Sequence, residues 1–310
     1  MSPRLHAWLL AGATATGKTA AAQLLAERLG CAILSADAML VYRGMDIGTA
    51  KPTPAERGRV AYFGIDLVTP AEPFSTGLWL ADAVRARAVA PAPLIAVGGT
   101  GLYLKALTHG LDGEAADPES RARWQALHDR EGLSALQRAL ASRDPAALAA
   151  LADPSNPRRL IRALEHLDAR GCLPDGWRRD SPRPHVPALR LPRAQLHARI
   201  ARRIAAMFKA GLVDEVRALR DAYPVWSPTA ARAIGYAEAL AVLDGALTPA
   251  QAAERAAART RQLAKRQETW LRHQTNTVWI DIDDRDPPEA VAERVLDIWR
   301  QYGPTPLVPF

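Results

Sequence analysis

A glycine-rich loop near the N-terminus carries the residue types that bind phosphate groups. It reads Gly12-Ala13-Thr14-Ala15-Thr16-Gly17-Lys18-Thr19, which matches the P-loop pattern G-x-x-x-x-G-K-[ST]. In such a loop the backbone N–H groups converge on phosphate oxygens, and the dipole of the following helix adds to their field. Lys18 supplies a point charge, and the Thr19 hydroxyl can bind Mg²⁺. We therefore predict a phosphate site at residues 12–19.

Two further polar residues follow predicted strands, where ligands bind in open α/β sheets. Asp37 is suited to hold Mg²⁺ through water or to act as a general base on an incoming nucleophile, and an ordinary loop-capping aspartate is the alternative. Thr100 lies in the run Gly98-Gly99-Thr100-Gly101, where glycines permit close approach of a ligand, or simply make a tight turn. This run stands where a Walker-B strand would end in aspartate, which argues against an ATPase.

Basic residues gather in two parts of the chain. Residues 158–203 contain twelve arginines and four acidic residues, a net charge of +8, whereas the whole chain carries +7. A second set recurs at helical spacing: Arg255, Arg259, Arg261, Lys265, Arg266 and Arg272. One such stripe is commonly a solvated helix face. Two separate clusters favour contact with a nucleic-acid backbone.

The elements that position these residues follow from hydrophobic periodicity. Strands are expected at 6–11, 31–35, 93–97 and 278–282, and helices at 19–29, 119–129, 133–142, 157–169, 196–223, 249–272 and 288–301. Strand signals are nearly absent from 115–192, and its last part, 171–192, reads as a loop. We therefore predict an α/β fold, a P-loop NTPase-like parallel sheet flanked by helices, with a core at 1–114, a basic helical insertion at 115–192 and a return to the core at 193–310.

Composition narrows the class of protein. At 310 residues, 48% hydrophobic and 24% charged, the chain is typical of globular proteins and unlike disordered ones. No apolar stretch reaches the roughly 18 residues of a membrane span, and we expect no signal peptide. The two cysteines and seven scattered histidines argue against a disulfide framework or a zinc site. A reducing cytoplasm is the expected compartment.

Several segments form a pattern that goes beyond the P-loop. They are Gly12–Thr19, Ser35–Asp37, Tyr42–Pro52, Gly98–Tyr103, Arg158–Glu165, Ala233–Tyr236 and Thr260–Gln267. Together they resemble the tRNA dimethylallyltransferase (isopentenyltransferase) family over about residues 8–282. The stretch Asp46-Ile47-Gly48-Thr49-Ala50-Lys51 is the most specific, because a P-loop alone is shared by many enzymes.

The resemblance implies a P-loop kinase-like core with a helical insertion that embraces the tRNA anticodon arm. It implies transfer of a dimethylallyl group from dimethylallyl diphosphate to the N6 amine of adenosine 37, next to the anticodon, to give N6-isopentenyladenosine. The implied cofactor is Mg²⁺, and no nucleotide is hydrolysed. The partners are then the tRNA anticodon stem-loop and the donor, with no membrane, and we expect a monomer.

Residue roles are carried over from the family by position. Asp37 is the base that accepts the proton of the amine, and Thr100 is a polar partner in catalysis. The diphosphate would be bound by Gly12, Ala13, Thr14, Ala15, Thr16, Gly17, Lys18, Thr19 and Arg217. Mg²⁺ would be bound by Thr19, with Asp37 acting through water. The tRNA would be contacted by Asp37, Ala38, Met39, Leu40, Thr100, Arg158, Arg159, Leu160, Ile161, Arg162, Lys265 and Arg266.

The chain departs from the family pattern at three places, and three other functions remain open. At one of these places, Val60–Asp66 stands where many members carry histidine before Leu-Ile-Asp. Ala13–Thr16 stand where the family commonly has Pro-Thr-Ala-Ser, and Ala38-Met39-Leu40 stand for Ser-x-Gln, so two polar side chains are missing after Asp37. One alternative is a P-loop kinase of a small metabolite with Asp37 as base, and another is an adenylate isopentenyltransferase that acts on a free nucleotide. Neither explains the charge of residues 158–203. A catalytically silent tRNA-binding protein is the third alternative.

Overall fold

The chain divides into two compact units, each with its own core. The computed structural model describes residues 6–90, 93–111, 117–174 and 183–307. One unit comprises Met1–Gly110 with Arg183–Phe310, and the other comprises Leu111–Pro182. The first unit contains the P-loop and the sheet that supports it, and the second is helical throughout its described part.

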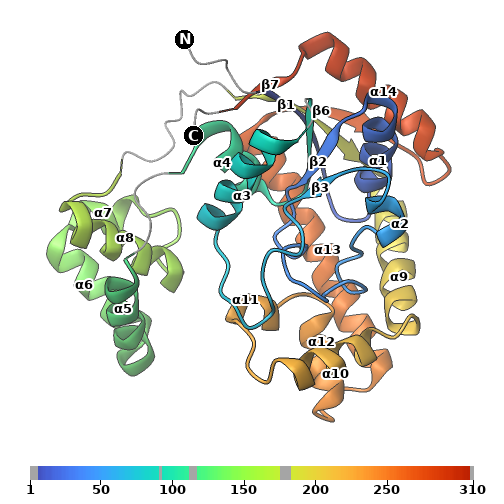
Figure 1. The fold of residues 1–310 in the computed structure, drawn as a ribbon. Coiled ribbons are helices and arrows are strands. Elements are labelled where there is room, and N and C mark those ends of the chain that lie inside the picture. The colour runs from blue at the N-terminus through green and yellow to red at the C-terminus, as the bar shows by residue number, and fades with distance from the viewer. Residues whose placement is uncertain (1–5, 91–92, 112–116, 175–182, 308–310) are drawn as a thin grey trace. The chain divides into compact units, whose positions relative to one another are not determined.

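The first unit is built on a largely parallel sheet with the strand order β3-β2-β4-β1-β5-β6 (Figure 1). The strands are β1 (His6–Gly12), β2 (Ala32–Ser35), β3 (Tyr62–Phe63), β4 (Leu94–Gly98), β5 (His185–Arg190) and β6 (Asn276–Asp281). A short β7 (Thr305–Pro306) pairs antiparallel with the start of β1. The apolar runs of β1, β2 and β4 fit a parallel sheet covered on both faces. The predicted fold class is confirmed.

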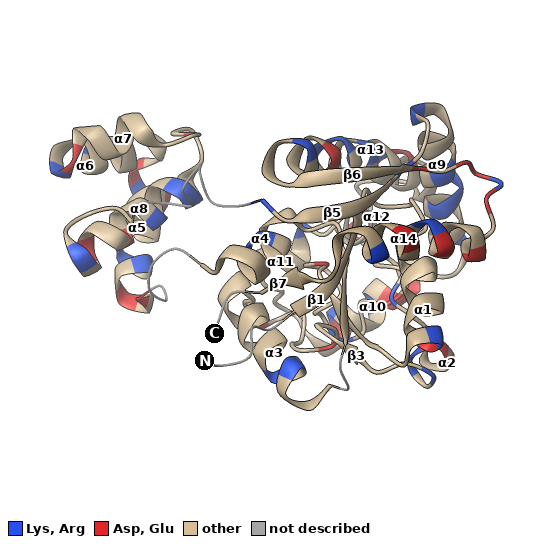
Figure 2. Ribbon diagram, turned by 90° about the horizontal axis from the view of Figure 1, so that it is seen from above, with Lys and Arg blue, Asp and Glu red and all other residues tan. Residues whose placement is uncertain are grey.

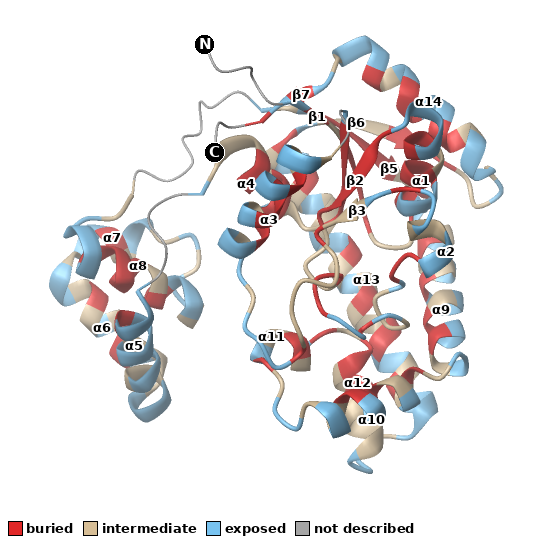
Figure 3. Ribbon diagram, viewed as in Figure 1, coloured by how far each residue is buried: buried red, intermediate tan, exposed pale blue. Residues whose placement is uncertain are grey.

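Helices cover both faces of this sheet. The helices α1 (Lys18–Leu29) and α14 (Pro288–Tyr302) pack together on one face, whereas α3 (Thr76–Val89) and α4 (Gly101–His109) pack together on the other (Figure 1). The long α13 (Pro249–Gln274) packs against α4, α9 and β1. The remaining helices are α2 (Pro54–Arg57), α9 (Arg193–Lys209), α10 (Leu212–Ala222), α11 (Pro228–Ala231) and α12 (Tyr236–Leu243). Figure 3 shows the central strands buried beneath them.

Local signals fix the ends of the helices around the P-loop. Helix α1 ends at Gly30, which has the left-handed conformation (φ +64°) and donates its N–H to the carbonyl of Ala26. Helix α13 begins at Pro249, as predicted, after a capping box in which Thr248 and Gln251 satisfy each other's backbone N–H groups. The sequence therefore predicted these two boundaries correctly.

The second unit is a helical cluster formed by α5 (Pro118–Glu131), α6 (Leu133–Arg143), α7 (Pro145–Ala150) and α8 (Pro157–Arg170). Three of its helices begin alike, with proline at the first position and a side-chain cap from Asp117, Asp144 or Asn156. Leu136, Leu140, Leu160 and Leu164 form the centre of its core. Buried Glu165 forms ion pairs with Arg121 and Arg162, which offset the free-energy cost of burying its charge.

Two predicted boundaries are wrong. Strand β5 lies inside the stretch 171–192 that reads as a loop, and because it pairs with β1 and β6, the insertion predicted at 115–192 ends earlier, before Arg183. The single helix predicted at 196–223 is two helices, α9 and α10, separated at Gly211, whose φ of +96° suits glycine. The start of the predicted insertion falls within residues 112–116, and a later part of it is residues 175–182. Both segments lie outside the described residues. No described helix is long and apolar enough to cross a membrane.

Candidate active site

The P-loop joins β1 to α1 and takes a sharply folded path. Gly12, Ala15 and Gly17 all have positive φ angles, of +149°, +67° and +87°. Inside the loop, the carbonyl oxygen of Ala13 accepts hydrogen bonds from Thr16 Oγ1 at 2.9 Å and from Lys18 Nζ at 3.2 Å. Thr19 is exposed on the first turn of α1. The structure therefore forms the predicted loop with a lysine folded against its backbone.

Lys18 is buried and lies in a cluster of charged groups. Burial lowers the pKa of its ammonium group to about 8, while Asp37 opposes this shift and Arg203 adds to it. These two side chains come from β2's carboxyl end and from α9. A polyanion bound in the loop would relieve the repulsion between the two cations.

Asp37 and Thr100 lie at the same edge of the sheet because β2 and β4 are neighbouring parallel strands, with Ser35 paired to Val97. Thr100 donates its backbone N–H to Ala36 (3.1 Å), and its hydroxyl oxygen accepts the N–H of Ala38 (3.1 Å). That hydroxyl therefore keeps its own hydrogen for a ligand. Asp37 is half-buried, and its Oδ1 accepts the N–H of Met39 at 3.0 Å.

The close approach of these strand ends requires glycine at position 98. A Cβ atom on Gly98 would lie 2.1 Å from the carbonyl oxygen of Ala36, which is too close for any side chain. The run of glycines noted in the sequence is thus explained by backbone packing at this position. The same close packing of the two strand ends brings Thr100 against Ala36 and Ala38.

Sequence reasoning missed three residues that reach this site. Gln267, on α13, accepts the N–H of Thr14 with its Oε1 at 2.8 Å. Arg203 and Arg199, both on α9, lie close to the P-loop and Asp37: Arg203 interacts electrostatically with Lys18 and Asp37, and Arg199 donates to the Ala15 carbonyl at 3.5 Å. All three belong to segments already identified as basic or family-like. Their partners, however, lie far away in the sequence, so spacing gave no signal.

Arg217, predicted to bind diphosphate, lies elsewhere. It is half-exposed on α10 and forms an ion pair with Asp214 one turn earlier on the same helix. Arg203 instead occupies the position beside Lys18 and Asp37. The placement of Arg217 therefore does not support its predicted role.

The motif at residues 46–51 attaches its loop to the helices behind the site. Tyr236, on α12, accepts the N–H of Gly48 at 3.2 Å and donates its hydroxyl to Glu215 at 2.6 Å. A Cβ on Gly48 would lie 2.4 Å from the Tyr236 ring, so glycine is required. The next residue, Thr49, offers its carbonyl to Arg203 at 3.4 Å. The motif thus helps to hold Arg203 at the P-loop.

The other predicted contact residues differ in how accessible they are. Leu40 is buried, and Ala38 and Met39 are half-buried against the core, so this segment presents little polar surface. On α8, Leu160 and Ile161 are buried in the core of the helical unit, so their side chains are not exposed on its surface. Accessible predicted residues on α8 and α13 are Arg158, Arg159, Lys265 and Arg266, and Arg162 pairs with Glu165.

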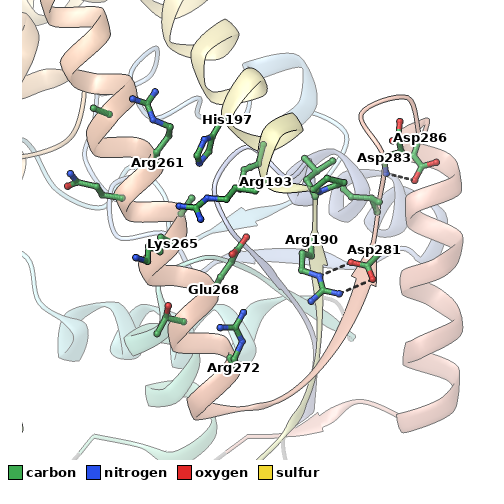
Figure 4. A pocket seen from close by; sticks show the side chains of 18 of the residues that line it. Arg190, Arg193, His197, Arg261, Lys265, Glu268, Arg272, Asp281, Asp283 and Asp286 are labelled. Atoms are coloured by element: carbon green, nitrogen blue, oxygen red, sulfur yellow. Dashed lines mark hydrogen bonds and ion pairs between the residues drawn. The ribbon is translucent and has the colours of Figure 1, made fainter.

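A cavity of about 1080 Å³ lies between α9, α13 and the carboxyl ends of β5 and β6 (Figure 4). Arg193 points from α9 towards Lys265 and Glu268 on α13, and Arg261 and Arg272 lie above and below them. Within the described part of the chain, no ion pair neutralises these four cations. Figure 2 shows Lys and Arg along both helices. Such a surface suits a phosphate-rich ligand.

The donor set available to a metal consists of oxygen atoms. The described residues contain no group of three or more His, Cys, Asp or Glu side chains that could hold a metal ion by themselves. Thr19 and Asp37 nevertheless offer a hydroxyl and a carboxylate near the P-loop, which suits Mg²⁺ when phosphate oxygens and water complete its shell.

Family models and curated relatives that match this chain are isopentenyl or dimethylallyl transferases. The family of IPP transferases matches residues 40–274, and the family of isopentenyl transferases matches residues 5–62. The chain is 44% identical to the tRNA dimethylallyltransferase of Bordetella petrii, over 93% of this chain and 96% of that one. It is equally identical, at 44%, to the tRNA dimethylallyltransferase of Anaeromyxobacter dehalogenans, over 93% and 98% of the two chains.

Solved structures are similar as well. The full-length tRNA isopentenylpyrophosphate transferase from Bacillus halodurans is 35% identical, with a TM-score of 0.63 over 95% of both chains. A eukaryotic dimethylallyltransferase that acts on tRNA is 21% identical, with a TM-score of 0.70 over 96% of this chain and 76% of that one. The second likeness concerns the fold alone.

Proposed function

The chain belongs to the IPP transferase family, and from that membership we propose that it transfers a dimethylallyl group from dimethylallyl diphosphate to tRNA. The acceptor is the exocyclic N6 amine of adenosine 37, beside the anticodon. The observation that carries this proposal is the position of Asp37 and Thr100 at the strand ends next to a P-loop with two buried or half-buried cations. A carboxylate and a diphosphate site are what the reaction needs.

The proposed reaction forms one C–N bond and breaks one C–O bond. The amine nitrogen attacks the first carbon of the allyl group, and pyrophosphate leaves with the electron pair of the C–O bond. Lys18 and Arg203 stabilise the charge that develops on the leaving oxygens. Asp37 accepts the proton that the amine loses, and the Thr100 hydroxyl orients the acceptor.

Magnesium is proposed as the cofactor, held by Thr19 and, through water, by Asp37. When bound it supplies additional positive charge to the diphosphate. The chain's own contribution is the preformed loop, in which Gln267 fixes the backbone of Thr14 from the side of α13. This support keeps the loop in place before the donor arrives.

The tRNA is proposed to contact basic surfaces in both units. In the first unit these are Lys265 and Arg266 on α13, together with the cavity that Arg193 also lines. In the helical unit they are Arg158 and Arg159, at the start of α8. The target base must leave its stack to reach a half-buried carboxylate, so we propose that it is extruded. The free cysteines and the tRNA substrate fit the cytoplasm.

The kinase and free-nucleotide alternatives lack a role for these basic surfaces. A direct assay separates all of the functions: transfer of radiolabelled dimethylallyl diphosphate with Mg²⁺ to unmodified tRNA, to the same tRNA with guanosine at position 37, and to AMP. Label in the first tRNA alone is the expected result. Label in AMP would indicate an adenylate isopentenyltransferase. Label in none of the three acceptors, with tRNA still bound, would indicate a silent binding protein.

A further inference from the structure

An acidic turn between β6 and α14 is fixed firmly to the first turns of α9 (Figure 2). The side-chain amide of Gln195 bonds it at two points: its Oε1 accepts the N–H of Asp284 at 2.9 Å, and its Nε2 donates to Asp283 Oδ2 at 2.7 Å. Within the turn, the N–H of Asp283 donates to Asp286 Oδ2 at 3.0 Å. The position of Asp284 is therefore set by α9 and by its own turn.

Asp284 uses this position to hold two arginines of α9. Its Oδ1 accepts from Arg199 Nε, and its Oδ2 accepts from Arg202 Nη2 at 2.7 Å. Arg199 Nη2 also donates to the backbone carbonyl of Asp284 at 3.3 Å. These contacts lower the pKa of Asp284, so its carboxylate is charged at neutral pH. One side of the Arg199 guanidinium is thereby fixed.

The other side of that guanidinium lies on the P-loop. Arg199 Nη1 donates to the carbonyl of Ala15 at 3.5 Å and would lie 3.6 Å from a Cβ atom placed on Gly17. Guanidinium has five N–H donors, of which Asp284 takes two and Ala15 takes one. Two remain on the terminal nitrogens. The Arg199 side chain is 24% exposed, so the side chain is not sealed off from solvent.

We propose that Asp284 is a positioning residue, which acts through Arg199 on a pyrophosphate group bound in the P-loop. It holds a third cation, after Lys18 and Arg203, where the diphosphate of the proposed donor binds. The inference rests on the proposed function for the identity of that ligand. Without Asp284, the long Arg199 side chain would be free to leave the loop for solvent, and ordering it would then oppose binding.

A through-space effect of Asp284 would have the opposite sign. Its negative charge near the P-loop would repel a diphosphate, so its removal would strengthen binding. The two roles therefore predict opposite changes in the same measurement. Asp284→Asn is a suitable variant because it removes the charge and keeps the size of the side chain.

The first test is calorimetric titration of inorganic pyrophosphate, with Mg²⁺, into wild type and Asp284→Asn. We expect the variant to bind about tenfold more weakly, equivalent to about 1.4 kcal/mol. In the transfer assay the KM for dimethylallyl diphosphate should rise by a similar factor, with a smaller change in kcat. Unchanged or tighter pyrophosphate binding would overturn the proposal. Asp297→Asn, which removes a charge paired with Arg300 within α14, is the control for net charge.

A double-mutant cycle shows whether Asp284 acts through Arg199. In an Arg199→Ala background, Asp284→Asn should have almost no further effect on pyrophosphate binding, because the positioned group is already gone. Full additivity would refute the positioning role even if the single variant binds weakly. The pyrophosphate titration does not depend on the acceptor. If wild type transfers no label to tRNA while these binding results hold, the proposed function fails and the positioning of Arg199 at an anion site stands.

Discussion

Replacing Lys18 by methionine should stabilise the free protein while it abolishes pyrophosphate binding. The pKa of Lys18 falls from an ordinary 10.5 to about 8, a difference equivalent to about 3 kcal/mol of unfavourable free energy for the buried charge. Methionine has a similar length and carries no charge. It loses the hydrogen bond to Ala13, which is worth about 1 kcal/mol. We therefore expect the free energy of unfolding at pH 7 to rise by about 2 kcal/mol.

The stability difference between Lys18→Met and the wild type should depend on pH, and the lowered pKa of Lys18 sets the direction of that dependence. Below pH 8 the lysine is protonated in both the folded and the unfolded chain, so the full penalty is present. Between pH 8 and 10.5 the folded protein releases the proton first, and the stability of the wild type rises relative to the variant. Above that range the penalty is gone, and the wild type should be the more stable protein by about the 1 kcal/mol of its hydrogen bond to Ala13.

Urea unfolding at pH 7, 8.5 and 10, at constant ionic strength, measures this difference directly. Lys209→Met is the matched control, because Lys209 is exposed near the end of α9 and the same charge is removed. Its effect should stay within about 0.5 kcal/mol at each pH. A Lys18→Met protein that is less stable than wild type at pH 7, or a difference that does not shrink with pH, would refute the reasoning.

Three further predictions concern the strand ends and α9. Asp37→Asn should lower single-turnover transfer to tRNA by a factor of about 10² to 10⁴ and leave pyrophosphate binding intact, and transfer at the wild-type rate would remove Asp37 as the base. Gly98→Ala should destabilise the fold by about 3 kcal/mol in urea, since its Cβ would lie 2.1 Å from Ala36; a midpoint equal to that of wild type would show that the strand ends can separate. Arg203→Lys should raise the donor KM about tenfold because its fork of donors is lost, whereas Arg217→Lys should change it less than twofold; the reverse order would restore the role first predicted for Arg217.

The sequence predicted those loops and helix ends that depend on residues close to each other in the chain. The P-loop, the end of α1 at Leu29 and the start of α13 at Pro249 are examples. Strand β5 was missed because the stretch 171–192 is rich in proline, arginine and aspartate, and proline within a run argues against a central strand. Its pairing with β1 covers only Ala188 and Leu189, whereas Pro187 lies in the ladder with β6, opposite Val278. Pairing of distant segments, which the local pattern does not encode, decided this element.

The candidate site divides in the same way. The sequence by itself identified Lys18, Thr19, Asp37 and Thr100 as candidate site residues, because a loop pattern and the ends of predicted strands point to them. Only the tertiary structure decided which arginine stands at the loop. Arg203 and Arg217 lie in one amphipathic stretch of sequence, but the chain breaks at Gly211, so Arg203 is on α9 beside Lys18 whereas Arg217 is on α10 and pairs with Asp214.

The partners of the P-loop show the physical reason most clearly. Gln267 contacts Thr14 across 253 positions of sequence, and Asp284 holds Arg199 across 85. A single glutamine or aspartate on a helix or in a turn has many equivalent uses in a sequence. Its use is fixed when packing places one particular backbone group within hydrogen-bonding distance, and that placement depends on the whole sheet and the helices that cover it.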